Sequence, residues 1–502
     1  MLIQSTHKRL YRWHSQLAFW TSILLLMLCV TAIPVVFKTE LQQYVLATSL
    51  SSPSTQSVNQ DTIAHLANQQ LGLAEHEFFV DLPGSDKQTV LWWWDDTQHR
   101  YHAYIVNAES QLTAVPEVDA VTTIALAHYE FLIPDPFGEY FVGLVGLATL
   151  VIIVIGVLLH VKWRKEKTQF RKHRSFRLWS SDLHKLIGFW LLPYHILVTY
   201  TGTILGLGGL LVIMTAFSSF EGDQEAAVAT ILGTEPELSH QYCDMLSIEQ
   251  LLQQSEQHWR KRYGKAELSS YDIHFYQDCN SVIGINTAIP GYLLLSNYQS
   301  LSMVDGSVVK EIDWIQGSFG ERWYALLGPL HFGHFAGYFG RWLYVISAVS
   351  LIGLIITGLL LWVDKQQLKP LPRKMDYFYI HPLLKLSVAV TIAIIATSYI
   401  LLILAKAMPS WFQQLSATTT YLISFFGFSI CVYYRPRGLR LFLFLLACLS
   451  IILIGVDLSA RVDRWLNGVN FSLAVFALIF FAAGFAVKRP EHSPNIIAET
   501  HA

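Results

Sequence analysis

The stretch HKLIGFWLLPYHILVTYTG, from His184 to Gly202, decides the class of fold. It is apolar enough to begin a membrane-spanning helix, yet it carries two histidines, His184 and His195, eleven residues apart. Ionisable side chains are costly in lipid, and they usually face the protein interior or a water-filled path. The stretch therefore predicts a membrane helix whose histidines have a function.

The composition of the whole chain is that of a polytopic membrane protein. Of its 502 residues, 53% are hydrophobic and only 14% are charged, whereas a soluble domain has roughly 25% charged residues. Eight apolar runs approach or exceed the roughly 17–25 residues that cross a bilayer. These runs are 17–37, 141–161, 187–217, 343–363, 383–404, 421–434, 441–456 and 471–487. We therefore predict an all-α membrane protein with about eight spans.

Lysine and arginine predict the orientation of these spans. They cluster before the first span, between the second and third, and after the fourth, sixth and eighth. By the positive-inside rule both termini are cytoplasmic, and segments 38–139 and 218–330 lie outside. The first run is longer than a signal-peptide core and no A-x-A site follows it, so we expect it to be retained. The net charge of −2 indicates no nucleic-acid partner.

The two external segments show signs of small α+β modules. The first has helical spacing over 61–73, followed by a hairpin formed by QTVLWWWDD and RYHAYIVNAES with its turn at 95–98. The second predicts a helix over 247–262 and strands near 271–276, 281–287 and 292–296. Cys243 and Cys279 both lie in this second segment, where an oxidising compartment would permit a disulfide.

The first four spans contain an internal duplication. HSQLAFWTSILLLMLCVTA, from His14, aligns with the opening stretch, and FGEYFVGLVG aligns with FGRWLYVISA. Gly156 and Gly358 occupy matching places, and His128 and His331 precede them in the two copies. Each unit is thus a helix, an external segment and a second helix. Two units in the same direction predict a pseudo-twofold axis along the membrane normal.

The histidines favour haem ligation over proton or cation transport. At least six lie in the spans or at their boundaries, with almost no Asp, Glu, Lys or Arg beside them. Neutral imidazoles without carboxylates are what bis-histidine haem b ligation needs. On one continuous helix, eleven residues bring His184 and His195 to nearly the same face, about 16 Å apart. That spacing would suit two stacked haems.

Each of these histidines needs a partner at its own depth. We predict His160 with His184 and His195 with His331. His14, His128 and His334 are the alternative ligands. His381 has no counterpart in the other repeat, so we interpret it as a boundary residue.

The sequence resembles the PepSY-associated transmembrane proteins, which are iron-regulated inner-membrane proteins of Gram-negative bacteria. The resemblance covers about residues 7–364 and rests on YRWHSQLAFW, GVLLHVKWRK, the opening stretch and GPLHFGHFAGYFGRWLYVISAVSLIGLIITGLLLWV. It implies PepSY-like periplasmic modules and a role in siderophore-iron use, since some members are di-haem reductases of ferric siderophores.

These observations predict a division of the chain and a function. The predicted parts are 1–37, 38–139, 140–217, 218–330, 331–364 and an accessory four-helix bundle over 376–490. The leading hypothesis is an inner-membrane oxidoreductase with two haems b that reduces ferric siderophore in the periplasm. Its electron donor would be separate, either quinol or a cytoplasmic reductant, because no GxGxxG between a strand and a helix is visible. The alternatives are a transporter of siderophore or peptide and a non-enzymatic PepSY-type regulator.

Overall fold

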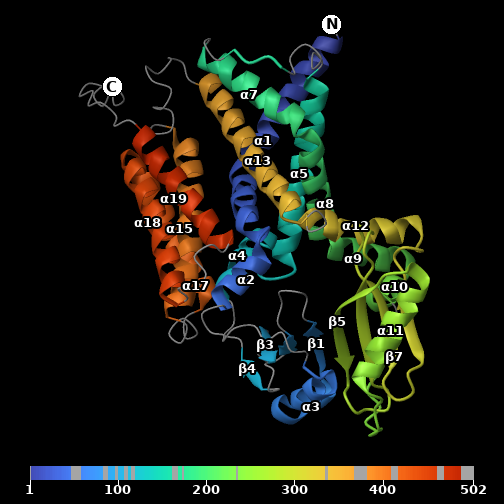
Figure 1. The fold of residues 1–502 in the computed structure, drawn as a ribbon. Helices are drawn as coiled ribbons and strands as arrows, with labels where there is room; N and C mark the ends of the chain where they lie inside the picture. The colour runs from blue at the N-terminus through green and yellow to red at the C-terminus, as the bar shows by residue number, and fades with distance from the viewer. Residues whose placement is uncertain are drawn as a thin grey trace. The chain divides into compact units, whose positions relative to one another are not determined.

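The computed structural model describes most of the chain, in two compact units (Figure 1). The described residues are 2–46, 58–82, 89–95, 100–106, 111–114, 119–160, 168–171, 175–232, 236–333, 337–366, 381–408, 416–460 and 468–487. The helical unit comprises Met1–Thr48, Asp119–Gly206 and Tyr338–Ala502. The sheet unit comprises Ser49–Val118 and Leu207–Gly337.

The helical unit is that of a multi-pass membrane protein. Its long apolar helices are α1 (Leu2–Val35), α5 (Phe137–Leu159), α13 (Gly337–Gln366), α15 (Pro382–Ala407), α17 (Ala417–Tyr434), α18 (Leu439–Ala460) and α19 (Gly468–Ala486). Among the described residues, these seven are long and apolar enough to cross a membrane, and an eighth span results if α8 (Leu192–Gly206) and α9 (Gly208–Ser219) count as one broken span. The shorter helices α2 (Lys38–Leu46) and α4 (Asp119–Tyr129) also belong to this unit.

The helix that contains the run 187–217, which was predicted to be a single span, is broken twice. Helix α7 (Phe176–Trp190) ends before Leu191, α8 begins at Leu192, and a second break at Leu207 precedes α9. Pro193 explains the first break, because it has no N–H to donate to the carbonyl four residues earlier. His184 and His195 therefore lie on different helices and do not share the face of one helix, contrary to the prediction.

Small residues bring α5 and α8 into close contact. A Cβ atom added to Gly206 would lie 2.9 Å from the backbone of Gly143, and one added to Gly146 would lie 2.7 Å from Thr203 Oγ1. Such contacts are typical of membrane helices, which associate through backbone approach and packing. This interface holds together the second helix of the first repeat and the first helix of the second.

The last four helices contain a buried ion pair that the sequence analysis did not anticipate. Lys406 on α15 lies 2.8 Å from Asp457 on α18, and their side chains are 0% and 5% exposed. The Lys406 ammonium also donates to the Tyr44 carbonyl at the end of α2, and Asn470 on α19 donates to Asp457. This polar network ties the C-terminal helices to α2.

The sheet unit contains one eight-stranded antiparallel sheet. Its strands are β1 (Glu77–Asp81), β2 (Val90–Asp95), β3 (Arg100–Val106), β4 (Leu112–Ala114), β5 (Glu267–His274), β6 (Val282–Ala288), β7 (Asn297–Ser302) and β8 (Val308–Ile312). They lie in the order β4-β3-β2-β1-β5-β6-β7-β8. The predicted strand near 292–296 is actually β7, a few residues later, and the predicted hairpin turn at 95–98 lies largely outside the described residues.

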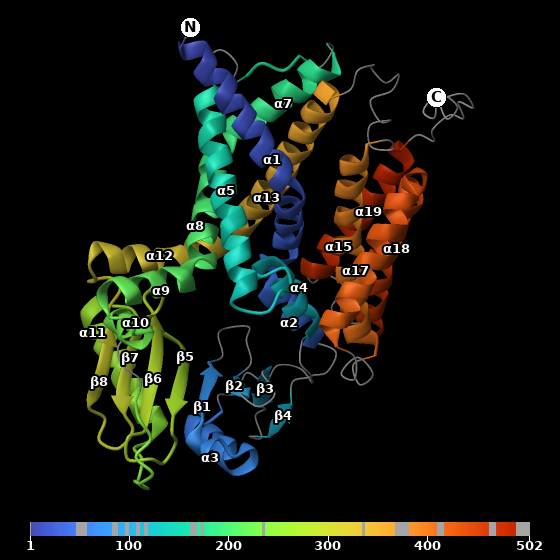
Figure 2. The same cartoon turned by 180° about the vertical axis from the view of Figure 1, so that it is seen from behind.

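The two external segments, predicted to be separate modules, share this sheet and its core. Strand β1 of the first segment pairs with β5 of the second, with Glu77 opposite His274 (Figure 2). Helices α3 (Gln60–Leu71) and α11 (Ile248–Tyr263) contribute Ile63 and Leu251 to a common apolar core that also contains Phe78 and Ile273. Each segment supplies four strands to the sheet and one helix to this shared core, and both halves bury their apolar faces together.

Three further helices and one disulfide complete the sheet unit. Helices α9, α10 (Gln224–Leu232) and α12 (Phe319–Phe332) belong to it. Helix α12 begins with a capping box formed by Ser318 and Glu321, which satisfies backbone N–H groups at its first turn. Cys243 and Cys279 form the predicted disulfide, with their Cα atoms 4.9 Å apart.

Candidate functional site

Two histidines from the two repeats lie close together in the helical unit. His14 lies on α1 and His184 on α7. Their ring centroids are 6.4 Å apart, and the ring planes are nearly perpendicular, at 86°. The sequence offered His14 only as an alternative ligand, although the two residues are counterparts in the duplication. Equivalent residues meet at the axis of a twofold repeat, so the duplication itself was the signal for this pair.

The surroundings of the two rings match in detail. His14 Nδ1 lies 3.1 Å from the Ile152 carbonyl on α5, and His184 Nδ1 lies 3.1 Å from the Leu354 carbonyl on α13. One turn further along each helix is a glycine against the ring. A Cβ on Gly156 would lie 3.2 Å from His14 Cε1, and one on Gly358 would lie 3.4 Å from His184 Cε1. The matched glycines therefore let each ring lie close against the second helix of its own repeat.

These hydrogen bonds determine which nitrogen is available to a metal. A carbonyl oxygen can only accept, so Nδ1 of each histidine must carry the proton. In a neutral imidazole the other nitrogen, Nε2, then presents a lone pair. A metal-ligating histidine is commonly held in this way, by a hydrogen bond from its other ring nitrogen to a backbone carbonyl.

The separation of the rings fits a shared metal ion. Two imidazoles on opposite sides of one ion, with metal–nitrogen bonds of about 2 Å, have ring centres roughly 6 Å apart. The observed 6.4 Å agrees with this separation. The residue types and this separation fit the group that the sequence predicts, since His14 and His184 would be able to hold one haem iron between them.

His128 on α4 is held in the same way as His14 and His184. Its Nδ1 lies 3.0 Å from the Leu28 carbonyl and 3.1 Å from Thr31 Oγ1, both on α1. Thr31 in turn donates to the Met27 carbonyl, so its oxygen accepts from the histidine. This leaves Nε2 of His128 as the unprotonated nitrogen of a neutral ring.

His195 has a different environment from the other histidines. It is 1% exposed, and its Nε2 lies 2.6 Å from Ser350 Oγ on α13. Ser350 gives its hydrogen to the Ser347 carbonyl, so His195 Nε2–H is the donor to Ser350. A hydrogen-bonded core histidine has this geometry, and ligation through Nε2 would require Ser350 to release it.

The other predicted ligands lie on separate elements of the fold. His160 follows the last residue of α5, where its backbone N–H bonds to the Val157 carbonyl. His331 lies in the last turn of α12, in the sheet unit, with its ring against Phe332. His334 lies outside the described residues. The pairs of His160 with His184 and of His195 with His331 stay predictions, whereas the structure brings His14 to His184.

Comparison with known proteins agrees with the resemblance that the sequence shows. A family model for the PepSY-associated TM region matches residues 11–365. A Pseudomonas aeruginosa protein, named only as uncharacterized protein PA4219, is 24% identical over 281 residues, which cover 54% of this chain and 69% of that protein. The family match contains both copies of the repeat and ends before α15 begins at Pro382.

Proposed function

Because the chain belongs to the PepSY-associated TM family, we propose that it is a haem-dependent membrane oxidoreductase that reduces ferric siderophore. The proposal places the sheet unit in the periplasm of a Gram-negative bacterium, with two haems b in the helical unit. The observation that carries it is the pairing of His14 and His184, with ring centroids 6.4 Å apart and both Nδ1 atoms bonded to backbone carbonyls.

The residues of this pair would hold and orient a haem. His14 and His184 would bind the iron through Nε2, and their bonds to Ile152 and Leu354 would fix the rotation of each ring. Gly156 and Gly358 would keep the rings close to α5 and α13. A bound haem supplies one-electron transfer at a potential that its axial ligands set.

The reaction needs one electron for each iron released. Fe(III) in the siderophore would gain one electron and become Fe(II), which siderophores hold far less tightly. The donor would be a separate reductant, either quinol or a cytoplasmic protein. In the described part of the helical unit, His128 would be a ligand of the second haem, because its Nδ1 is bonded to a carbonyl as in the first pair. The Cys243–Cys279 disulfide agrees with an oxidising compartment for the sheet unit.

Haem content and spectra test the proposal directly. Protein purified from haem-supplied cells should show reduced b-type absorption bands and two haems per chain. His14→Ala and His184→Ala should each remove the same haem, because each leaves the iron with one protein ligand. His381→Ala is the matched control, since His381 precedes α15 and lies against Trp362. Colourless protein would refute the proposal.

The same variants test the partner of His184 and the reaction. If His160 were that partner, His160→Ala would reproduce the loss in His184→Ala while His14→Ala kept both haems, and this result would refute the His14 assignment. Reduced wild-type protein should be reoxidised by ferric siderophore as Fe(II) appears in a chromogenic chelator assay. Siderophore uptake by proteoliposomes lacking any electron donor would favour a transporter instead.

A further inference from the structure

A cluster of three potential metal ligands lies where the two halves of the sheet join. Glu77 is on β1, and Asp272 and His274 are on β5. The strands pair so that Glu77 is opposite His274. Asp272 and His274 alternate with Tyr271 and Ile273, which lie in the core of the unit. The three side chains therefore share the face of the sheet opposite that core.

The distances within this cluster fit a metal ion. His274 Nε2 lies 3.2 Å from Glu77 Oε1 and 3.3 Å from Asp272 Oδ2. Three ligands at about 2.1 Å from a tetrahedral metal lie about 3.4 Å from one another. All three potential ligand atoms lie within 4.8 Å of each other. The ligand set is thus nearly assembled in the folded chain.

Charge also favours a cation at this position. Asp272 and His274 are 5% and 9% exposed, so little water screens this carboxylate and the imidazole, and Glu77 adds a second carboxylate from the more exposed side of the ring. Nε2 can carry one proton, which cannot satisfy two carboxylates equally. A divalent cation at this point accepts the nitrogen lone pair and neutralises both carboxylates.

A glycine in the next strand makes room for the cluster. Gly284, on β6, is opposite Asp272, and a Cβ added there would overlap Asp272 Oδ2 and the Tyr298 hydroxyl. Tyr298 OH donates to Asp272 at 3.2 Å, and the Lys310 ammonium lies 5.3 Å from the centre of the Tyr298 ring. Glycine weakens a strand interior and often marks a place where a ligand approaches closely. Here it lets Tyr298 orient a carboxylate of the cluster.

We propose that Glu77, Asp272 and His274 bind a divalent first-row transition-metal ion such as Zn²⁺ or Fe²⁺. Imidazole nitrogen together with carboxylate oxygen suits these ions. The three protein ligands leave one position for water or for another ligand. The site is in the sheet unit and is independent of haem, so it can exist whether or not the chain is a reductase.

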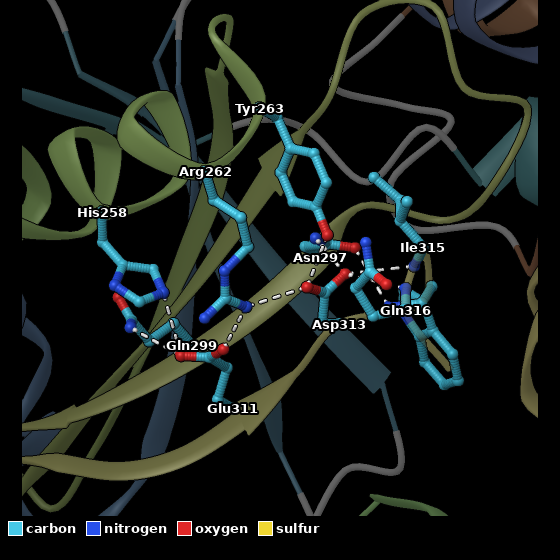
Figure 3. Close-up of polar contacts among 10 residues, drawn as sticks. His258, Arg262, Tyr263, Asn297, Gln299, Glu311, Asp313, Ile315 and Gln316 are labelled. Carbon is cyan, nitrogen blue, oxygen red and sulfur yellow. Dashed lines mark hydrogen bonds and ion pairs between the residues drawn. The ribbon is translucent and has the colours of Figure 1, made fainter. Parts of the chain in front are cut away.

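A second histidine–carboxylate contact in the same unit provides a control. His258 Nε2 lies 3.0 Å from Glu311 Oε2. Figure 3 shows that the Arg262 guanidinium lies between Glu311 and Asp313, and its Nη1 atom donates to both carboxylates at 2.6 and 2.8 Å. Because this arginine already pairs with both carboxylates and its positive charge repels a cation, the His258 cluster should bind no divalent cation.

Equilibrium dialysis of the full chain against Zn²⁺, with metal analysis, tests the proposal. The detergent-purified protein should bind one Zn²⁺ that Glu77→Gln and His274→Gln each release, with affinity falling at least about tenfold. His258→Gln should bind as the wild type does. Glu77 has a 43% exposed side chain, so Glu77→Gln should fold, and circular dichroism checks this. The proposal would be overturned if the wild type bound no Zn²⁺ or if both ligand variants bound Zn²⁺ as the wild type does. It would also be overturned if His258→Gln lost as much Zn²⁺ affinity as the ligand variants.

Discussion

The buried pair of Lys406 and Asp457 makes the sharpest prediction about stability. Asp457→Asn would leave the Lys406 ammonium, which is 0% exposed, without its carboxylate at 2.8 Å. The Tyr44 carbonyl and the Tyr44 ring, 4.0 Å away, would remain as its partners. Removing one member of a buried pair typically costs about 3–5 kcal/mol. At 1.4 kcal/mol per factor of ten, the folding equilibrium should fall by at least about 100-fold.

A double-mutant cycle separates the pair from its surroundings. Lys406→Met should also destabilise, because Asp457 would keep only polar partners such as Asn470. The double variant should lose less than either single variant, since it leaves no unpaired charge. Unfolding in mixed detergent micelles with increasing SDS measures each free energy. Asp364→Asn is the matched control, because the Arg177–Asp364 contact is 3.9 Å long, with side chains 61% and 23% exposed, and should contribute less than about 1 kcal/mol. An Asp457→Asn loss as small as that of the control, or strictly additive losses, would refute this reasoning.

Two further predictions concern the histidine pair and the sheet unit. Gly156→Ala places a Cβ 3.2 Å from His14 Cε1, so it should turn that ring and change the low-spin ferric EPR signal, which for planes 86° apart should be strongly anisotropic. Gly188→Ala, whose Cβ meets only the Leu354 side chain at 3.6 Å, should leave the signal unchanged, and equal signals in both variants would contradict the assignment. Desolvation raises the pKa of Asp313, but hydrogen bonds from Tyr263 and Arg262 outweigh it and hold that pKa below its usual value. The resulting stability is present above the unfolded pKa of about 3.8 and is lost as the pH falls through the lower folded pKa. The melting temperature of the full chain should therefore fall less steeply between pH 6 and pH 3 for Asp313→Asn than for the wild type. Parallel curves of melting temperature against pH would contradict the prediction.

Local patterns in the sequence predicted much of the fold. Apolar runs predicted the membrane helices, and alternation predicted β2, β3, β5 and β6. The position of Cys243 and Cys279 in one external segment also indicated that they could form the disulfide that the structure shows. These features depend on residues that are close in the chain or on composition, so a single sequence is enough to find them.

Contacts between distant parts of the chain were harder to predict. The pairing of β1 with β5 depends on two edges that are far apart in sequence, and no local pattern shows which edges meet. The apolar pattern continues through the break at Leu191, so His184 and His195 were predicted to lie on one face of one helix. Lys406 and Asp457 were missed because each lies near the end of an apolar run, where a charge ordinarily faces the lipid headgroups.

The internal duplication carried the most information about which histidines come together, but it did not decide the predicted ligand pairs. It identified His14 and His184 as counterparts, as it did Gly156 and Gly358. The expected pseudo-twofold axis implies that counterparts near it come together, which is the arrangement of the two rings. Ranking ligands by depth in the membrane instead favoured His160, which lies at the end of α5.

The pairing of β1 with β5 means that the sheet can be completed only late in synthesis. Strands β1 to β4 leave the ribosome before the membrane helices α5 and α8, and β5 to β8 follow them. Until β5 arrives, β1 is an open edge strand, which can pair with other chains. Both halves must reach the same side of the bilayer, so the chain between them crosses it an even number of times. If synthesis stopped after α8, the chain would contain only half of the sheet, and chaperones or proteases could recognise its exposed edge. Pairing of β5 with β1 covers that edge once the second half has been made.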